Sequence, residues 1–317
     1  MSILLQTNLP LPLFKRGKVR DVYDLGDKLL IVSTDRISAF DVVLPCGISD
    51  KGKVLNQLSA FWFEKTDRII PNHLIKVIDS LDAFQDVIAS TPTVIARAES
   101  PKQSQRGGDS SLMLGTGLVG RSMIVAKAER IPVECVVRGY LSGSAWAEYK
   151  DAGKVGNNYL PSGMGESQEL PQPLFTPTTK SEVGHDRPLT DQDIEELGIK
   201  DLIGELEAKS LLIYCYARDY AKPKGIIIAD TKFEFGLING KLALIDELLT
   251  PDSSRFWDAS KYKPGQSQLS FDKQPVRDWL LASGWDKEPP APMLPPEVIE
   301  ATTQRYRKIY NLFTQSS

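Results

Sequence analysis

Residues 226–236, which read IIIADTKFEFG, decide how the centre of this chain folds. The first half is a continuous apolar run, which is typical of a buried strand. The second half alternates, so Asp230, Lys232 and Glu234 face one side of the strand and the intervening residues face the other. Three charges on one face of a strand that leaves the core are costly unless they meet a ligand or an ion. A solvated sheet face carrying a charge ladder is the alternative.

Past this strand the chain turns at Asn239-Gly240 and runs back to Asp246. Asn-Gly between apolar segments is a strong hairpin signal. A two-residue turn would pair Asp246 with Phe233, on the opposite face from Glu234. A three-residue turn would place Asp246 on the face of Glu234. We predict the three-residue turn, because the two carboxylates could then hold one magnesium ion.

A basic hairpin is expected near the N-terminus. Val19–Tyr23 and Leu29–Val32 read as two short strands, and Lys18 and Arg20 follow Gly17 on one strand face. A glycine-containing hairpin that bears cations can cover a triphosphate and neutralise its charge. A basic exposed strand is the alternative.

A second candidate for anion binding is the segment 138–144, RGYLSGS, which joins a predicted strand to a predicted helix. Backbone N–H groups at the helix start, the Ser144 hydroxyl and the Arg138 guanidinium would bind a phosphate. A helix cap with a structural arginine is the alternative. Two further polar loops carry charged and hydroxyl groups, residues 176–186 and 250–255.

Several elements are expected elsewhere from periodicity and caps. Helices are predicted over Lys53–Lys65, Leu202–Ala221 and Glu297–Phe313, the last beginning at Pro296. Thr190 caps a further helix, with Asp193 three residues on as a partial capping box. The Pro- and Gly-rich segment Val155–Arg187 is expected to be a long loop.

Composition excludes several classes of protein. The 317 residues have a net charge of -3, which gives no overall attraction to nucleic acid or an anionic membrane. Three scattered cysteines and two histidines cannot form a disulfide framework or a zinc site. The N-terminus lacks the features of a signal peptide, and no apolar run is long enough to span a membrane, so a cytoplasmic location is expected.

Two phosphate-binding motifs are matched by chance. The stretch Gly47–Lys53 fits GxxxxGK, but Val54 replaces the hydroxyl residue that should bind magnesium. The glycines at positions 115, 117 and 120 fit GxGxxG, but they lead into a strand-like segment where a helix is required.

The combined motifs resemble those of the SAICAR synthetase family, in its monofunctional form. The resemblance runs in the family's order over nearly the whole chain and rests on Gly17–Tyr23, Ser33–Asp41, Glu134–Trp146, Leu174–Asp186, Ile226–Leu237 and Asp246–Trp257. The polar stretch Ser100–Gly120 departs from it as an apparent insertion.

The resemblance implies an α+β fold of antiparallel sheets with flanking helices, a kinase-like or ATP-grasp-like nucleotide site between two lobes, and a C-terminal helix. We expect a β-rich nucleotide-lid domain over residues 1–119, with a mobile insertion at about 100–119. A central α+β domain over 120–273 would carry the substrate and metal sites, and a helical segment would cover 274–317.

The resemblance also implies an activity, the ATP-dependent condensation of L-aspartate with carboxyaminoimidazole ribotide (CAIR) in purine biosynthesis. Because a carboxylate oxygen is a poor leaving group, the γ-phosphoryl group would first be transferred to the CAIR carboxylate. The protein then positions the reactants and neutralises charge. A small-molecule kinase and a non-catalytic anion-binding protein are the alternatives. A monomer or homodimer with small-molecule substrates only is expected.

The roles of individual residues follow from the same resemblance. Catalytic residues would be Lys232, Lys180 and Asp186; substrate-binding residues Arg138, Ser144, Arg255, Asp230 and Ser38; nucleotide-binding residues Gly17, Lys18, Arg20, Lys127 and Glu129; and magnesium ligands Glu234 and Asp246. The segment Asp35–Asp41 is a candidate for the aspartate pocket.

Overall fold

The computed structural model describes residues 3–91, 116–180 and 187–315. The chain divides into two compact units, and each takes residues from separate stretches of the sequence. Unit 1 comprises Met1–Phe61, His73–Lys127 and Lys273–Tyr310, and unit 2 comprises Trp62–Asn72, Ala128–Asp272 and Asn311–Ser317. The division at residues 119 and 273 stays a prediction.

Unit 1 is built on an antiparallel sheet with the strand order β1-β2-β3-β7-β6. Its strands are β1 (Leu13–Arg16), β2 (Arg20–Asp24), β3 (Lys28–Ser33), β6 (Leu74–Ile78) and β7 (Ser122–Ala126). The expected hairpin joins β2 to β3, where Gly26 has a φ of 96° that favours glycine. Apolar side chains from β2, β3 and β6 pack with Phe84 and Val87 of helix α2 (Leu81–Ser90) into one core cluster.

A second core in unit 1 lies around the strand pair β4 (Arg36–Ala39) and β5 (Val42–Gly47). Ile37 and Leu44 from this pair pack with Val276 and Leu280 of helix α8 (Gln274–Ala282). Two longer helices contribute residues to both units, α1 (Lys51–Thr66) and α9 (Pro296–Thr314). Both predicted helices are therefore confirmed, including the start of α9 at Pro296.

The start of α1 shows why the segment that matches GxxxxGK does not form a phosphate-binding loop. The backbone N–H of Gly52 donates to the Asp35 carboxylate at 3.0 Å, so a side chain already occupies the position of an anion. A Cβ at position 52 would lie 2.1 Å from the carbonyl oxygen of Ser33. Glycine is needed there because the helix start packs closely on the end of β3.

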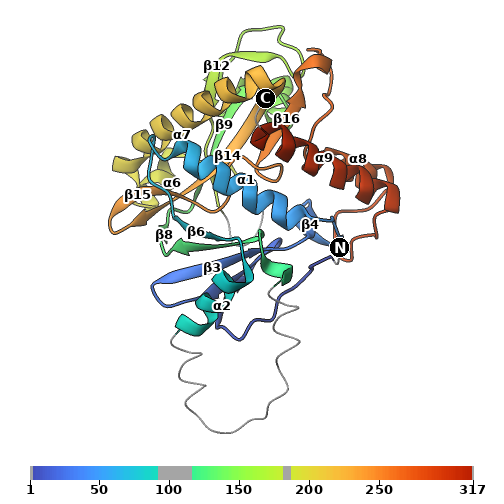
Figure 1. Cartoon of the computed structure of the whole chain (residues 1–317). Helices are drawn as coiled ribbons and strands as arrows, with labels where there is room; N and C mark the ends of the chain where they lie inside the picture. Colours follow the sequence, from blue (N-terminus) through green and yellow to red (C-terminus); the bar gives the residue numbers. More distant parts are fainter. Residues whose placement is uncertain (1–2, 92–115, 181–186, 316–317) are drawn as a thin grey trace. The chain divides into compact units, whose positions relative to one another are not determined.

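Unit 2 is built around the long strand β14 (Ile226–Ile238), which lies between β9 (Val133–Tyr140) and β15 (Lys241–Ile245) in the sheet (Figure 1). The edge strand β12 (Glu169–Phe175) continues the order β12-β9-β14-β15. Shorter strands pair with these, β8 (Glu129–Arg130) and β16 (Ser254–Asp258) with β14 and β13 (Thr178–Thr179) with β9. The pairings within unit 2 are antiparallel.

Helices complete unit 2. They are α5 (Ser144–Ala152), α6 (Asp191–Glu196) and α7 (Lys200–Ala221), with 3-10 turns η1 (Lys222–Lys224) and η2 (Ala259–Lys261). Helix α7 packs on β9 and β14, where the Tyr214 hydroxyl donates to the Ile228 carbonyl at 2.7 Å. The capping box of Thr190 and Asp193 is confirmed at the start of α6.

The expectation of one long loop over Val155–Arg187 is wrong for its described part. That part contains β12, β13 and a hairpin of β10 (Lys154–Val155) with β11 (Asn158–Tyr159). Pro171 and Pro173 weakened the strand signal, but β12 is an edge strand, where proline is tolerated. Its hydrogen-bonding partner, β9, is remote in sequence, so local composition could not reveal the pairing.

Antiparallel sheets with flanking helices and a C-terminal helix confirm the predicted α+β class. Among the helices formed by the described residues, none is both long and apolar enough to cross a lipid bilayer.

Candidate active site

The carboxylates of Glu234 and Asp246 lie together in unit 2. Glu234 is on β14, and Asp246 directly follows the last residue of β15. Their side chains are in hydrogen-bonding contact. Glu234 is only 8% exposed, so the pair is enclosed by protein and its negative charge is poorly solvated.

The predicted three-residue turn is wrong. Ile238 pairs with Lys241, so Asn239 and Gly240 form a two-residue turn, and both have positive φ, at 51° and 74°. Asp246 nevertheless reaches Glu234 because the ladder has ended at Ile245 and the backbone of Asp246 is left-handed, with a φ of 68°. Strand alternation does not govern a residue outside the ladder.

Burial and the neighbouring Asp246 raise the pKa of Glu234 to about 7, and Lys180 opposes this shift. The Lys180 ammonium donates to a Glu234 carboxylate oxygen. A cation beside the pair therefore favours its ionised form, against burial and the repulsion between the two carboxylates. A magnesium ion would serve the same electrostatic purpose.

Glu134 on β9 completes the charged group, and the sequence reasoning missed it as a site residue. Its carboxylate accepts a hydrogen bond from the Lys232 ammonium at 3.0 Å and lies 3.7 Å from that of Lys180. Burial by itself lowers the pKa of Lys232, but Glu134 and other carboxylates raise it above its ordinary value. Glu134 and Arg138 share one face of β9, as Asp230, Lys232 and Glu234 share one face of β14. This even spacing of charged residues on a second strand was the sequence signal that could have identified Glu134.

The described residues contain no cluster of three or more acidic, histidine or cysteine side chains suited to a metal ion. Glu234 and Asp246 thus offer two carboxylates, and this donor set fits magnesium. Magnesium prefers oxygen ligands and usually keeps water and substrate phosphates as its remaining ligands.

Two arginines lie near the start of helix α5. Arg138 donates through Nε to the Thr176 hydroxyl at 2.9 Å and through Nη2 to the Ser144 hydroxyl at 3.3 Å. The Arg255 guanidinium pairs with the Asp230 carboxylate at 2.5 Å. Burial lowers the pKa of Arg138, and the nearby Arg255 lowers it further. Two guanidinium groups this close favour an anion between them.

Gly143, the residue before α5, brings the backbone against Arg255. It has a φ of 58°, and a Cβ there would lie 2.5 Å from Arg255 Nη2. Glycine therefore lets the helix start approach the guanidinium. Ser142 Oγ lies 3.2 Å from Asp230 Oδ2, so the same loop also touches the partner of Arg255. Helix start, hydroxyls and arginines together have the composition of a phosphate site.

In unit 1 the basic turn lies between β1 and β2. The Gly17 N–H donates to the Arg20 carbonyl at 2.8 Å, which closes the turn. The Lys18 ammonium pairs with Asp41 at 2.6 Å, and both side chains are more than half exposed. Exposed cations on a glycine-containing hairpin are accessible to an anionic ligand.

The other nucleotide- and substrate-binding candidates lie on neighbouring segments. The Lys127 ammonium donates to both Asp24 carboxylate oxygens, at 2.7 and 2.9 Å, which lowers the pKa of Asp24. Ser38 lies in β4, and Glu129 lies in β8 beside Leu237 of β14. Asp186 and most of the Ser100–Gly120 stretch fall outside the described residues.

The structure thus forms two groups of predicted residues. Unit 2 gathers Arg138, Ser144, Lys180, Asp230, Lys232, Glu234, Asp246 and Arg255, with Glu129 on its strand β8. Unit 1 carries Gly17, Lys18, Arg20, Ser38 and Lys127. Paired carboxylates, two partly buried lysines and an arginine-lined helix start are the parts of an enzyme that acts on a phosphorylated, acidic substrate.

Known proteins match this chain along its full length. The family model described as SAICAR synthetase matches residues 13–292. The phosphoribosylaminoimidazole-succinocarboxamide synthase of Thermodesulfovibrio yellowstonii is 47% identical over 314 residues, covering 99% of each chain. That of Geobacter metallireducens is 49% identical over 308 residues, covering 96% of this chain and 95% of the relative. The chain therefore belongs to the SAICAR synthetase family, whose members are ligases.

Solved structures agree. A SAICAR synthase from Saccharomyces cerevisiae, complexed with SAICAR, superimposes with a TM-score of 0.81 at 40% identity and covers 99% of both chains. A SAICAR synthetase in complex with ADP gives a TM-score of 0.64 at 26% identity, covering 96% of this chain and 98% of that one. The predicted family and fold class are confirmed.

Proposed function

We propose that this chain uses ATP to condense L-aspartate with the carboxylate of CAIR, which gives SAICAR, ADP and phosphate, in purine biosynthesis. Membership of the family supports the reaction. The observation that carries the assignment to residues is that one sheet of unit 2 brings together the Glu134, Lys180, Lys232, Glu234 and Asp246 cluster and the paired arginines Arg138 and Arg255.

In the proposed mechanism an oxygen of the CAIR carboxylate attacks the γ-phosphorus of ATP, and ADP leaves. The acyl phosphate formed has a good leaving group, so the aspartate amine attacks its carbonyl carbon and expels phosphate. Lys232 and Lys180 line the region of the reacting carboxylate, and Asp186, which lies outside the described residues, is assigned to the same region by the family resemblance alone. The ammonium groups of Lys232 and Lys180 neutralise charge as the phosphoryl group moves, which is the main contribution a protein makes to such a transfer.

Glu234 and Asp246 would hold magnesium, which supplies charge neutralisation to the ATP phosphates. Lys180 now pairs with Glu234, so it has to share or yield that oxygen when the ion binds. The Arg138 guanidinium, the Ser144 hydroxyl and the Arg255 guanidinium would hold the ribotide phosphate. Asp230 keeps Arg255 in place through their ion pair.

The proposed nucleotide contacts come from Lys18 and Arg20 of unit 1 and from the segment at which unit 1 passes into unit 2. Lys18 and Arg20 would bind ATP phosphates from the turn after Gly17, and the segment from Lys127 to Glu129 would bind the adenine. In the Asp35–Asp41 segment, Ser38 is assigned to aspartate. Arg36 is left out of that assignment, because its guanidinium is bound to backbone carbonyls and to Asp21. The exposed Lys18 side chain supports its role, because a phosphate can reach it.

The reaction is tested by a coupled assay for ADP. The ligase forms ADP, one molecule for each SAICAR, only when CAIR and aspartate are both present. A small-molecule kinase would form ADP with one of them alone, and a non-catalytic protein would form none. Positional isotope exchange in ATP with CAIR, in the absence of aspartate, would support the acyl phosphate over a concerted route.

A cytoplasmic location and a monomeric or homodimeric state belong to the same proposal. Cell fractionation and light scattering on the purified chain test them. Binding of nucleic acid or membrane is not part of it, since the chain has a net charge of -3.

A further inference from the structure

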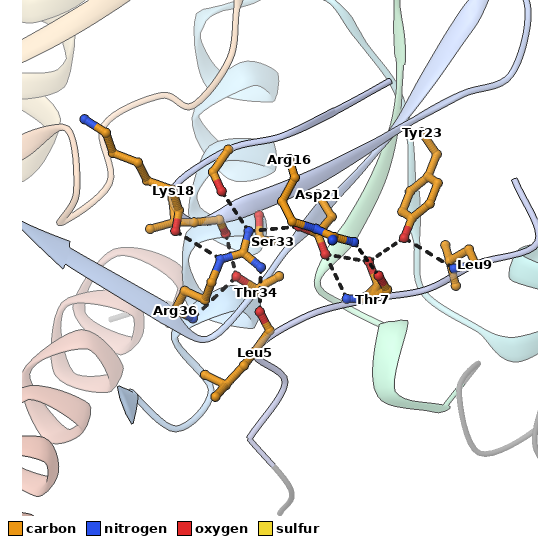
Figure 2. Close-up of polar contacts among 12 residues, drawn as sticks. Leu5, Thr7, Leu9, Arg16, Lys18, Asp21, Tyr23, Ser33, Thr34 and Arg36 are labelled. Atoms are coloured by element: carbon orange, nitrogen blue, oxygen red, sulfur yellow. Dashed lines mark hydrogen bonds and ion pairs between the residues drawn. The ribbon is translucent and has the colours of Figure 1, made fainter. Parts of the chain in front are cut away.

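The Arg36 side chain binds the backbone of the basic turn that carries Lys18 (Figure 2). Its Nη2 donates to the Gly17 carbonyl at 2.9 Å, and its Nε donates to the Lys18 carbonyl at 3.0 Å. Its Nη1 donates to the Leu5 carbonyl of the N-terminal segment. One guanidinium therefore holds two successive carbonyls of the turn, and only 11% of its side chain is exposed.

Holding these carbonyls sets the direction of the neighbouring N–H groups. In a planar trans peptide the C=O and the following N–H point in opposite directions. The carbonyls of Gly17 and Lys18 point at Arg36, so the N–H groups of Lys18 and Val19 point away from it. Both N–H groups therefore face away from the guanidinium that holds the turn.

The charge of Arg36 is balanced by Asp21, which is completely buried. Arg36 Nη2 lies 2.9 Å from Asp21 Oδ1, and Thr7 donates to Asp21 Oδ2 through both its N–H and its hydroxyl at 2.8 Å. The pair has several hydrogen bonds besides its ionic contact, which a buried ion pair requires. The turn is thus attached to a rigid part of unit 1.

Arg16 gives the matched comparison. Its Nε lies 3.2 Å from the same Asp21 oxygen, and its Nη2 donates to the Thr7 carbonyl at 2.8 Å. Arg16 therefore shares the carboxylate and the N-terminal segment with Arg36, but its hydrogen bonds go to neither Gly17 nor Lys18. A comparison of Arg16 and Arg36 variants therefore separates the contribution to stability that both arginines make from the contact with the turn that Arg36 makes.

We propose that Arg36 is a positioning residue for the nucleotide phosphates, because it holds the Gly17-Lys18 turn in the conformation that presents Lys18 and the adjoining N–H groups to the triphosphate. The inference rests on the proposed contact of Lys18 with ATP. Arg36 acts through the turn and touches no substrate itself.

The test compares Arg36→Lys, Arg36→Met, Arg16→Met and Lys18→Met by steady-state kinetics, with ATP, CAIR and aspartate varied in turn. A small displacement of a binding group costs on the order of 10-fold or more. We expect both Arg36 variants to raise the KM for ATP by ~10-fold or more, with the KM for CAIR within about 2-fold of the parent. Arg16→Met should lower thermal stability and leave the KM for ATP within about 2-fold.

The outcomes separate the two proposals. Lys18→Met with an unchanged KM for ATP refutes the nucleotide role of the turn itself. A raised KM for ATP in Lys18→Met but not in the Arg36 variants leaves that role intact and overturns the inference about Arg36. An equal rise in Arg16→Met, or a failure of Arg36→Lys to fold, also overturns it, because either shows a general structural role.

Discussion

At the scale of single residues, the site depends on backbone conformations that most side chains avoid. Asp246 has a φ of 68°, and this turns its carboxylate toward Glu234 although its position in the register places it on the other face. Non-glycine residues with positive φ cost free energy and are concentrated at functional sites. In this chain the left-handed backbone at Asp246 places two carboxylates beside each other. A divalent cation bound there would relieve their repulsion.

Removing either proposed magnesium ligand should abolish most of the activity and leave the fold intact. For Glu234→Gln and Asp246→Asn we expect turnover to fall by about 100-fold or more, because a metal ligand in a charge-stabilising site is worth several kcal/mol. The measurement is turnover at increasing magnesium concentration, with circular dichroism to check folding. Asp219→Asn, in an exposed ion pair of α7, is the control. Full activity in both site variants would contradict the assignment.

Lys232→Ala should separate chemistry from nucleotide binding. The ammonium of Lys232 pairs with Glu134 and is assigned to the reacting carboxylate. We expect loss of ADP formation with an unchanged affinity for ATP, measured by calorimetry. The exposed Lys241 of β15 provides the control variant Lys241→Ala. If ATP binding were lost together with activity, the role assigned to Lys232 would be wrong.

Asp21→Asn should lower stability in a manner that depends on pH. Burial by itself raises the pKa of Asp21, but hydrogen bonds from Arg36 and Thr7 bring it below its ordinary value of 3.8. A lowered pKa contributes stability above the unfolded-state value, and this contribution is lost as the pH falls through the folded-state value. We expect a loss of about 3 kcal/mol at pH 7, as for a broken buried ion pair.

Urea unfolding at pH 7 and at about pH 3 checks this expectation. The difference between the parent and Asp21→Asn should shrink at the lower pH, because Asp21 is then largely protonated in the unfolded state and folding has to release that proton. Asp219→Asn should show no comparable dependence, since Asp219 is exposed. A difference that stays constant with pH would show that the ionised form of Asp21 is not what stabilises unit 1.

At the scale of elements, Gly236 lets the short strand β8 approach β14. A Cβ there would lie 2.9 Å from the Glu129 carbonyl oxygen and 3.0 Å from the Ala128 Cβ. Contacts this short with backbone force a shift of the strand. The segment affected is the one assigned to adenine, so packing and nucleotide binding are linked through this glycine.

Gly236→Ala should therefore destabilise the protein by about 1–3 kcal/mol and weaken ATP binding. Gly204→Ala, within helix α7, is the matched control because a Cβ there has nothing within 4 Å. It should stabilise the protein by about 0.4–1 kcal/mol, since alanine restricts the unfolded chain. Thermal unfolding and calorimetry with ATP measure both effects. Equal stability of the two variants would refute the steric argument.

At the scale of the whole molecule, the two proposed phosphate-binding segments should respond to different ligands. Hydrogen exchange read by peptide should show that ATP analogues with magnesium slow exchange in residues 16–20 of unit 1. CAIR should slow exchange in residues 138–145 and 253–256 of unit 2. These expectations follow from the proposed phosphate contacts of Lys18 and Arg138. Protection of the 16–20 segment by CAIR alone would contradict the assignment.

The sequence by itself determined the family and those elements whose signals are local. Apolar runs, caps and turn residues predicted α1, α7, α9 and β14, because those signals are local. The motifs identified the family, and the alternation along β14 identified Asp230, Lys232 and Glu234 as one charged face.

Only the tertiary structure decided which residues meet. Glu134 joined the site because β9 pairs with β14 across a long stretch of chain, and the strands β12 and β13 depend on pairing with β9 as well. Asp246 reaches Glu234 because of its positive φ. Arg36 binds the Gly17-Lys18 turn because the fold packs its strand beside that turn. The free energies of such contacts arise from neighbours distant in the chain, so no local pattern encodes them.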